Sequence, residues 1–239
     1  MTMTKISFGP VYTRIQDLVT VQEFADVVQK RGFDSLWVTE SIVTPDPGLD
    51  CLSTVAAFVG ATTRLTLGSC VLLMPFRSPA LLAKAVATLD VLSGGRIVLG
   101  VGAGGDYNRK AFEVCGVRLE ERGARCDEGL GIMTKLWTGL PVNHSGRFYS
   151  FRDIVMKPRP IQKPHPPVWV GGEAESVLKR TARWGDGFVP SYVTPADYRC
   201  MLDRIADYAK GFGRDISSLT KALHLYVLID DNCEDAERR

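Results

Sequence analysis

The chain has 239 residues, of which 45% are hydrophobic and 23% charged, and a formal net charge of +2, which predicts one globular domain over residues 1–239. No basic stripe with interleaved aromatic residues occurs, and no apolar run approaches the ~20 residues that span a bilayer, so neither nucleic acid nor a membrane is an expected partner. The six cysteines form no C-x-x-C pair, and the first residues lack the apolar core of a signal peptide, so we expect no metal site and a cytoplasmic protein with reduced thiols.

Strand-like runs recur along the chain and alternate with helical patterns. The predicted strands, rich in β-branched and apolar residues, are residues 6–12, 35–40, 65–73, 96–101, 168–170, 188–190 and 224–229.

Five helices are predicted between these runs, one of which follows residues 168–170 and is described below. Thr20 and Glu23 form a capping-box pattern that opens a helix ending near Arg31. Ser78 and Pro79 open a second helix, which ends before Gly94. Two further long helices cover residues 120–137 and 195–211. The second helix carries an apolar stripe, expected to face the core, made of Leu81, Leu82, Ala85, Val86, Leu89 and Leu92.

Repeated strand–helix units with strands apolar on both faces indicate a parallel sheet covered by helices. The residues leave two architectures open, a doubly wound sheet and a (β/α) barrel. One segment, about residues 139–166, interrupts the alternation of strands and helices. It has a Ser-Gly turn between aromatic-rich arms and then a proline-rich run. It is interpreted as an insertion, a hairpin followed by an extended stretch.

A glycine motif in residues 100–105 matches the dinucleotide pattern G-x-G-x-x-G after a strand. A dinucleotide fold needs an acidic residue at the end of the next strand, about 20 residues on. Here Glu120 and Glu121 open a helix instead, so a flexible loop is the preferred interpretation and the dinucleotide fold the weaker one.

Gly171 and Gly172 separate a predicted strand from a helix that begins within residues 173–176 and runs to Trp184. Taken alone, the two glycines favour a tight turn. The alternative is a bare helix N-terminus that binds a phosphate.

Candidate catalytic residues are scarce in this sequence. Its three histidines are His144, His165 and His224, and no hydrolase, zinc or phosphate-loop motif occurs. This scarcity favours chemistry carried by an organic cofactor.

Five segments together resemble the bacterial luciferase-like flavin monooxygenase family, in order from residue 5 to about 230. They are RGFDSLWVTES, LTLGSCVLLMPFRSPALLAKAVATLDVLSGGRIVLGVGAGG, GRFYSF, KPRPIQKPHPPVWVGG and TARWGDGFVPS. The resemblance implies a TIM-type (β/α)8 barrel of class α/β with the cofactor at the carboxyl ends of the strands. That cofactor is FMN or, in some relatives, the deazaflavin coenzyme F420, and the other partner is a small organic substrate.

The resemblance also assigns cofactor-binding residues. Cys70 and Val71 fall in a bulge beneath the flavin ring, where relatives often hold a non-proline cis peptide bond. Asn108 matches an asparagine that contacts the cofactor in deazaflavin-dependent relatives. The remaining expected contacts, the last four of them near the cofactor phosphate, are Glu40, Gly171, Gly172, Glu173 and Ser176.

Two positions depart from the family pattern. Many relatives carry histidine where this chain has Ser41, and serine cannot transfer a proton near neutral pH as histidine can. Gly105 stands where sugar-phosphate dehydrogenases of the deazaflavin branch use a glutamate, so that activity is not expected. No acid or base is assigned.

Only seven strands are evident, so the chain is expected to be either a shortened piece of a longer protein or a seven-stranded variant. The first hypothesis is an FMN-dependent monooxygenase that forms a homodimer. A deazaflavin-dependent hydride-transfer enzyme is the close alternative, and a non-catalytic flavin-binding protein is the rival from another class.

Overall fold

The computed structural model describes residues 6–13, 20–43 and 48–227. Its main sheet has eight parallel strands in the order β1-β2-β3-β5-β8-β9-β10, with β4 paired to β5. Both β3 and β4 pair with β5, so the sheet has seven strand positions in the described part of the chain. The strands are β1 (Val11–Tyr12), β2 (Ser35–Val38), β3 (Thr66–Ser69), β4 (Leu72–Leu73), β5 (Ile97–Gly102), β8 (Val168–Gly171), β9 (Gly187–Val189) and β10 (Thr220–Lys221).

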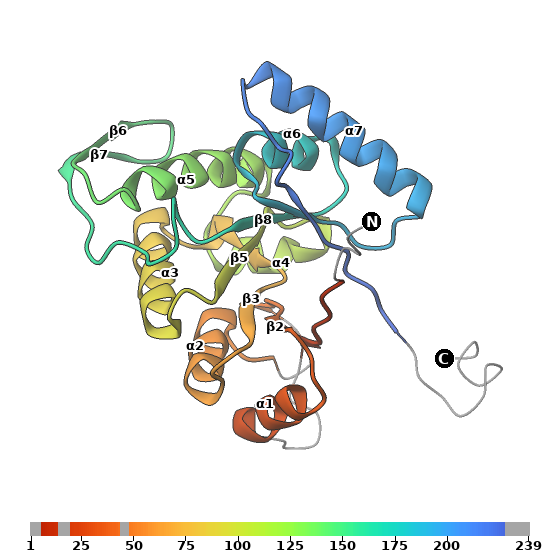
Figure 1. Ribbon diagram of the computed structural model, residues 1–239. Coiled ribbons are helices and arrows are strands. Elements are labelled where there is room, and N and C mark those ends of the chain that lie inside the picture. Colours follow the sequence, from red (N-terminus) through yellow and green to blue (C-terminus); the bar gives the residue numbers. More distant parts are fainter. Residues whose placement is uncertain (1–5, 14–19, 44–47, 228–239) are drawn as a thin grey trace.

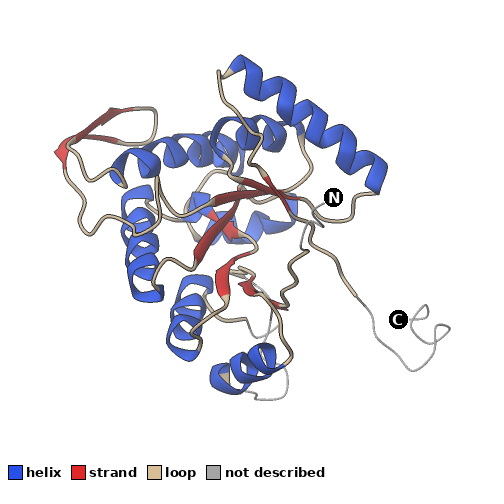
Figure 2. Ribbon diagram, in the orientation of Figure 1, coloured by secondary structure: helices blue, strands red, loops and turns tan. Residues whose placement is uncertain are grey.

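The sheet curls into a half-barrel, and the long helices lie around its outside (Figures 1 and 2). This arrangement is the predicted barrel class rather than an open doubly wound sheet, which has helices on both faces. The helices are α1 (Val21–Lys30), α2 (Cys51–Ala61), α3 (Pro79–Ser93), α4 (Arg109–Val114), α5 (Arg122–Leu136), α6 (Glu175–Trp184) and α7 (Pro195–Gly211), with 3₁₀ turns η1 (Met74–Phe76), η2 (Asp106–Asn108) and η3 (Leu119–Glu121).

The local signals at the helix ends act as predicted. The side chain of Thr20 accepts a hydrogen bond from the Glu23 N–H at 3.1 Å, and the Glu23 carboxylate accepts one from the Thr20 N–H at 2.8 Å. This capping box opens α1. α3 begins at Pro79 and ends at Ser93, and its C-cap Gly94 has a φ of 69°, the left-handed conformation that favours glycine.

The predicted apolar stripe of α3 is wrong for two of its members. The side chains of Leu81 and Leu92 are 73% and 67% exposed. α3 packs between α2 and α5 as well as on β5, so its buried face is wide and is rotated away from these two leucines. That face contains Leu82, Ala83, Val86, Ala87, Leu89 and Asp90.

Large side chains fill the inside of the half-barrel, and glycines make room for them. The rings of Trp37 on β2 and Trp169 on β8 stack with centroids 4.7 Å apart. A Cβ on Gly68 would lie 2.7 Å from the Trp37 ring, and one on Gly187 would lie 2.4 Å from the Trp169 ring. Glycine is therefore required at both strand positions.

The hairpin predicted in residues 139–166 is formed by β6 (Val142–Ser145) and β7 (Ser150–Ile154). Glu128 of α5 holds it, because one carboxylate accepts hydrogen bonds from the His144 ring and from the N–H groups of Phe148 and Tyr149. The hairpin is thus attached to the outer helix layer.

The predicted first and last strands are wrong in their extent. Only Val11–Tyr12 of residues 6–12 is a strand. The last strand lies earlier than predicted, at Thr220–Lys221 beside β9, and His224 forms only an isolated bridge with Ser191. Residues 225–227 are outside any strand, and residues 228 and 229 lie outside the described residues.

Two helices, α2 and α4, were not among the predicted elements. α2 is apolar on nearly all sides, so it gives no amphipathic signal. α4 has only six residues.

Candidate functional site

A cavity of about 950 Å³ opens at the carboxyl ends of the strands. Its volume is at the upper end of the ~300–1,000 Å³ found for cofactor sites. Because the strands are parallel, the segments that follow them meet at this one edge. The cavity lining includes all eight predicted cofactor-binding residues: Glu40, Cys70, Val71, Asn108, Gly171, Gly172, Glu173 and Ser176.

Val71 lies between the end of β3 and the start of β4. The peptide bond between Cys70 and Val71 is cis, as predicted. Its two methyl groups fill the space above neighbouring glycines: a Cβ on Gly102 or on Gly171 would lie 2.7 Å from one of them. Gly171 is therefore glycine because Val71 occupies the place of its side chain. The predicted dinucleotide-like motif has the same explanation, since Gly100 lies against the Ser69 carbonyl and Gly102 against Val71.

The strand-to-helix turn after β8 leaves an uncapped helix end at the cavity. Gly172 has a φ of +113°, which other residues rarely adopt. The cap residue of α6, Ala174, has no side chain able to cap it. Among the described residues, the N–H groups of Glu175 and Ser176 have no protein acceptor. The tight turn thus presents free N–H groups together with the positive end of the helix dipole, which is the geometry that the phosphate-binding interpretation requires.

Glu173 lines the cavity, but its carboxylate accepts a hydrogen bond from the Ser191 N–H at 2.7 Å. It therefore connects the segment after β8 to the segment after β9. A carboxylate repels a phosphate, so the backbone N–H groups of α6, rather than the Glu173 side chain, suit an anion here.

Asn108 closes the glycine loop after β5. Its side-chain oxygen accepts a hydrogen bond from the Gly105 N–H at 3.0 Å, and Gly104 holds a left-handed φ of +77°. In the part of the chain that the structure describes, the amide nitrogen of Asn108 has no partner. The residue thus presents one free donor group at the cavity.

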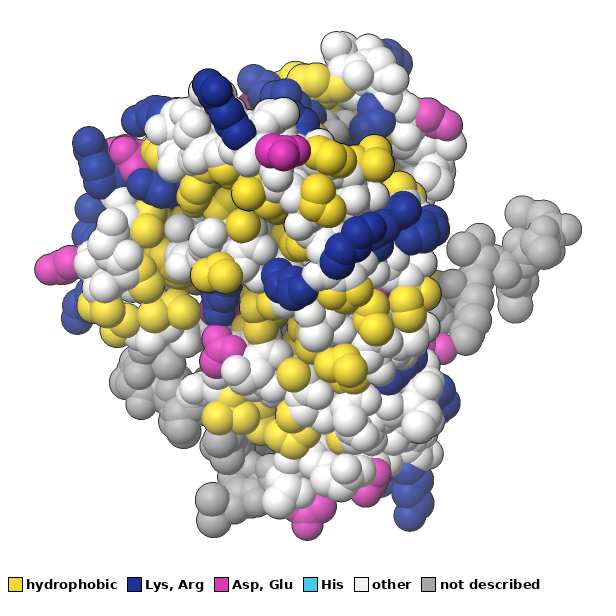
Figure 3. Space-filling model, turned by 90° about the vertical axis from the view of Figure 1, so that its left-hand side faces the viewer, with side chains coloured by type: hydrophobic (Ala, Val, Ile, Leu, Met, Phe, Trp, Pro, Cys, Tyr) yellow, Lys and Arg dark blue, Asp and Glu magenta, His cyan; other side chains and the backbone are white. Residues whose placement is uncertain are grey.

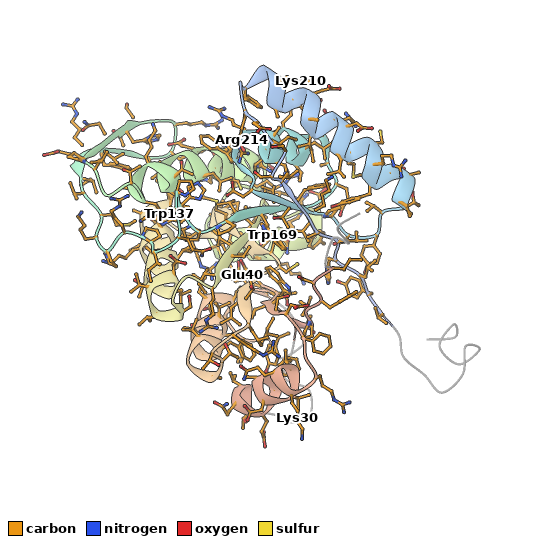
Figure 4. The ribbon with its side chains drawn as sticks, in the orientation of Figure 1. Lys30, Glu40, Trp137, Trp169, Lys210 and Arg214 are labelled. Atoms are coloured by element: carbon orange, nitrogen blue, oxygen red, sulfur yellow. The ribbon has the colours of Figure 1, made fainter. Side chains whose placement is uncertain are left out.

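Glu40, labelled in Figure 4, lies just after β2 and is almost fully buried, with a side chain 1% exposed. Its carboxylate accepts a hydrogen bond from the Leu73 N–H at 2.6 Å and lies 2.6 Å from the Arg77 guanidinium. Burial raises the pKa of Glu40, and the hydrogen bond and charge of Arg77 oppose that rise. Ser41, in contrast, is exposed and does not line the cavity.

The structure adds cavity residues that the sequence interpretation missed. Four of them follow the last two strand positions: Ser191, Tyr192, His224 and Tyr226. They could have been predicted from the barrel fold, because residues just beyond the strand ends line the site of such a barrel. His224 and Tyr226 were missed because the last strand was predicted too late in the chain, so they were assigned to the strand and not to the segment after it.

These features fit a flavin or deazaflavin. The cavity has the volume, an uncapped helix end suits the phosphate, and a free amide donor can hydrogen-bond a polar edge of the ring. Within the described ranges, no group of three His, Cys, Asp or Glu side chains could hold a metal ion, and no helix is long and apolar enough to cross a membrane.

Comparison with known proteins decides the family. The profile of the luciferase-like monooxygenases matches residues 1–239. The chain belongs to this family.

Curated family members similar to this chain are oxidoreductases. It is 32% identical over 181 residues to the phthiodiolone/phenolphthiodiolone dimycocerosates ketoreductase of Mycobacterium tuberculosis, covering 74% of this chain and 47% of that protein. It is 35% identical over 190 residues to the F420-dependent glucose-6-phosphate dehydrogenase of Amycolatopsis mediterranei, covering 76% of this chain and 54% of that one. The chain thus spans about half the length of these relatives.

Among solved structures, the monooxygenase RslO1 from Streptomyces bottropensis is 25% identical, with a TM-score of 0.80 over 91% of this chain and 67% of that one. The F420-dependent tetrahydromethanopterin reductase of Methanopyrus kandleri has a TM-score of 0.82 at 21% identity over 98% of this chain and 69% of that one, and it shows the fold alone. The chain therefore belongs to a family whose similar members include monooxygenases and F420-dependent enzymes.

Proposed function

We propose that the chain carries the cofactor site of a deazaflavin-dependent oxidoreductase that transfers hydride between F420 and the carbon of a secondary alcohol or ketone. The observation that carries this proposal is the free amide donor of Asn108 at the cavity. Two similar curated relatives, a ketoreductase and an F420-dependent dehydrogenase, support it. Sugar-phosphate dehydrogenases of the deazaflavin branch use a glutamate at the position of Gly105. A simple alcohol or ketone is therefore the proposed substrate class, rather than a sugar phosphate.

In this proposal each part of the cavity has one task. The N–H groups at the start of α6, next to Gly172, hold the cofactor phosphate. Cys70 and Val71 form the wall against the ring, and burial raises the pKa of the Cys70 thiol to about 11, so that thiol stays neutral. The bound cofactor supplies the hydride chemistry that side chains lack.

Glu40 and Arg77 fix the shape of the cavity beside the ring. Their ion pair ties the end of β2 to Arg77, the residue after η1, while the Leu73 N–H bond ties Glu40 to β4. Asp50 binds the same guanidinium at 2.8 Å. These contacts connect the segments that carry Glu40, Asp50, Leu73 and Arg77.

The test separates the free donor of Asn108 from its structural role. Asn108→Asp keeps an oxygen for the Gly105 N–H and removes the amide donor. We expect its affinity for F420, measured by fluorescence titration, to fall about tenfold, since one hydrogen bond contributes ~0.5–1.5 kcal/mol. Asn143→Ala, a change in the β6–β7 hairpin, is the matched control and should bind as wild type. Equal F420 affinity in wild type and Asn108→Asp contradicts the proposal.

The second candidate is an FMN-dependent monooxygenase, favoured by the similarity to RslO1. Heat release of the cofactor from purified protein, followed by mass spectrometry, distinguishes FMN from F420. Rapid reaction of the reduced holoprotein with oxygen supports FMN, because deazaflavins resist oxygen. Tight binding with no turnover of any alcohol, ketone or oxygen would favour the non-catalytic alternative.

A cytoplasmic location belongs to the same proposal. It is supported by the five cysteines in the described ranges, all of which are free thiols.

A further inference from the structure

The cavity contains a single histidine among the residues that the structure describes. His144 belongs to the β6–β7 hairpin and His165 to the proline-rich run, whereas His224 lines the cavity. Ser41 replaces the histidine that many relatives carry after the second strand. His224 is therefore the candidate for proton transfer in this cavity, and its contacts bear on that role.

The backbone and one ring nitrogen of His224 are fixed. Its N–H donates to the Pro190 carbonyl at 3.0 Å, and it forms a parallel bridge with Ser191. Its Nδ1 lies 3.3 Å from the Ser191 hydroxyl, and its ring centroid lies 4.8 Å from that of Tyr226. The other ring nitrogen, Nε2, has no hydrogen-bond partner in the described part of the chain. A half-buried imidazole with one nitrogen anchored and one free is suited to proton exchange.

Residues that follow three neighbouring strands are connected by contacts that hold the His224 ring. Glu173, after β8, accepts from the Ser191 N–H, and Ser191, after β9, contacts His224, which follows β10. When Nδ1–H donates to the Ser191 hydroxyl, the lone pair is on Nε2. The contact with Ser191 fixes the orientation of the ring, which makes Ser191 a positioning residue.

We propose that His224 exchanges the proton with the substrate oxygen, an inference that rests on the proposed hydride-transfer function. In the oxidation of a secondary alcohol, Nε2 takes the hydroxyl proton, and the O–H electron pair becomes the second bond of the carbonyl. The hydrogen on carbon leaves with its two electrons to the oxidised deazaflavin. In ketone reduction, the imidazolium returns the proton to oxygen while hydride arrives at carbon.

The charged and titratable groups around His224 are compatible with this role. The phenol of Tyr226 lies beside the ring, and Tyr226 in turn interacts with Tyr192, Tyr107 and Cys70. The Glu173 carboxylate is engaged by Ser191. The cavity lining also contains the charged residues Glu40, Glu120, Arg122 and Arg180. Burial lowers the pKa of His224. The ring is thus neutral at pH 7 and able to accept a proton.

The first experiment uses the full chain loaded with F420 and 2-propanol as the probe. We expect His224→Gln to lower kcat/KM about 100-fold or more while the dissociation constant for F420 stays within twofold. Wild-type kcat/KM should fall as the pH drops through the pKa of His224, and the variant should lose that limb. His144→Gln is the matched control with full activity and an unchanged pH profile.

A second readout does not depend on turnover. In proton NMR of the loaded protein, the imidazole resonance that disappears in His224→Gln should shift when 2-propanol is added, and the His144 resonance should not. Ser191→Ala should keep the pH limb but lower kcat/KM, because Nδ1 of His224 loses the contact that orients the ring.

The outcomes separate the two proposals. If F420 does not bind or 2-propanol is not oxidised by the wild type, the proposed function fails and the inference fails with it. If the wild type oxidises 2-propanol and His224→Gln is within threefold of it from pH 5 to 8, the proposed function stands and the role of His224 is overturned. A resonance of His224 that does not respond to 2-propanol overturns it as well.

Discussion

Ser176 is the residue at which phosphate binding can be tested without backbone strain. Gly172→Asp is less suitable, because the φ of +113° at Gly172 would add strain to any effect on binding. Ser176 lies in the first turn of α6, where an acidic side chain favours the helix by ~0.3–1 kcal/mol.

We expect Ser176→Asp to fold at least as stably as wild type and to bind FMN and F420 more weakly, because its carboxylate repels a phosphate. Ser176→Asn is the control of equal size without charge, and riboflavin, which lacks the phosphate, is the control ligand. Fluorescence titration at low ionic strength measures both. The phosphate assignment fails if the Asp and Asn variants bind FMN equally.

Gly171 offers a test of packing inside the half-barrel. An added Cβ would lie 2.7 Å from a methyl group of Val71, so Gly171→Ala should lower the free energy of unfolding by ~1–3 kcal/mol. The double variant Gly171→Ala/Val71→Ala should recover part of this loss, because the colliding methyl is gone. Gly60→Ala, with nothing within 4 Å of the new Cβ, is the control. Additive losses in urea denaturation would show that the two residues do not compete for space.

At the scale of elements, the attachment of the β6–β7 hairpin to α5 should depend on pH. Burial opposes ionisation of Glu128, but the hydrogen bonds from His144, Phe148 and Tyr149 prevail and lower its pKa. A carboxyl whose pKa is lower in the folded state stabilises above its unfolded pKa of ~4.3 and loses that contribution as the pH falls through the folded value.

We therefore expect Glu128→Gln to be destabilised by ~1.5–3 kcal/mol at pH 7 and to differ less from wild type at pH 3. Urea denaturation at both pH values measures the difference. Glu113→Gln, on the short helix α4, is the control. An equal difference at pH 7 and pH 3 would mean that ionisation of Glu128 does not hold the hairpin.

For the whole molecule, the homodimer remains a prediction. α3 exposes Leu81 and Leu92, and Figure 3, which views the side of α3 and the hairpin, shows hydrophobic side chains in several patches between charged ones. Burial of exposed leucines against a second copy would stabilise association. Sedimentation velocity should show a dimer at micromolar concentration.

We expect Leu81→Lys/Leu92→Lys to shift that dimer to monomer without loss of folded structure by circular dichroism. Val114→Lys, at an equally exposed apolar residue of α4, should remain dimeric. A monomeric wild type would contradict the predicted homodimer. A double variant that remains dimeric would show that the dimer interface does not include Leu81 and Leu92.

The sequence by itself determined the elements with strong local causes. The capping box of Thr20 and Glu23, the proline start of α3 and the left-handed glycine at its end depend on residues within a few positions of one another. Strand–helix alternation then restricted the fold to parallel architectures. The family motifs selected the barrel and named eight residues that the structure brings to one cavity.

Tertiary structure decided what depends on contacts between distant segments. The exposure of Leu81, the requirement for glycine at Gly171 and the meeting of Glu173, Ser191 and His224 arise from neighbours far away in the chain. Local periodicity cannot show which strand ends become adjacent, because the curling of the sheet sets that distance. The same curling places His224 in the cavity, while Ser41, in the position of the expected histidine, lies outside its lining.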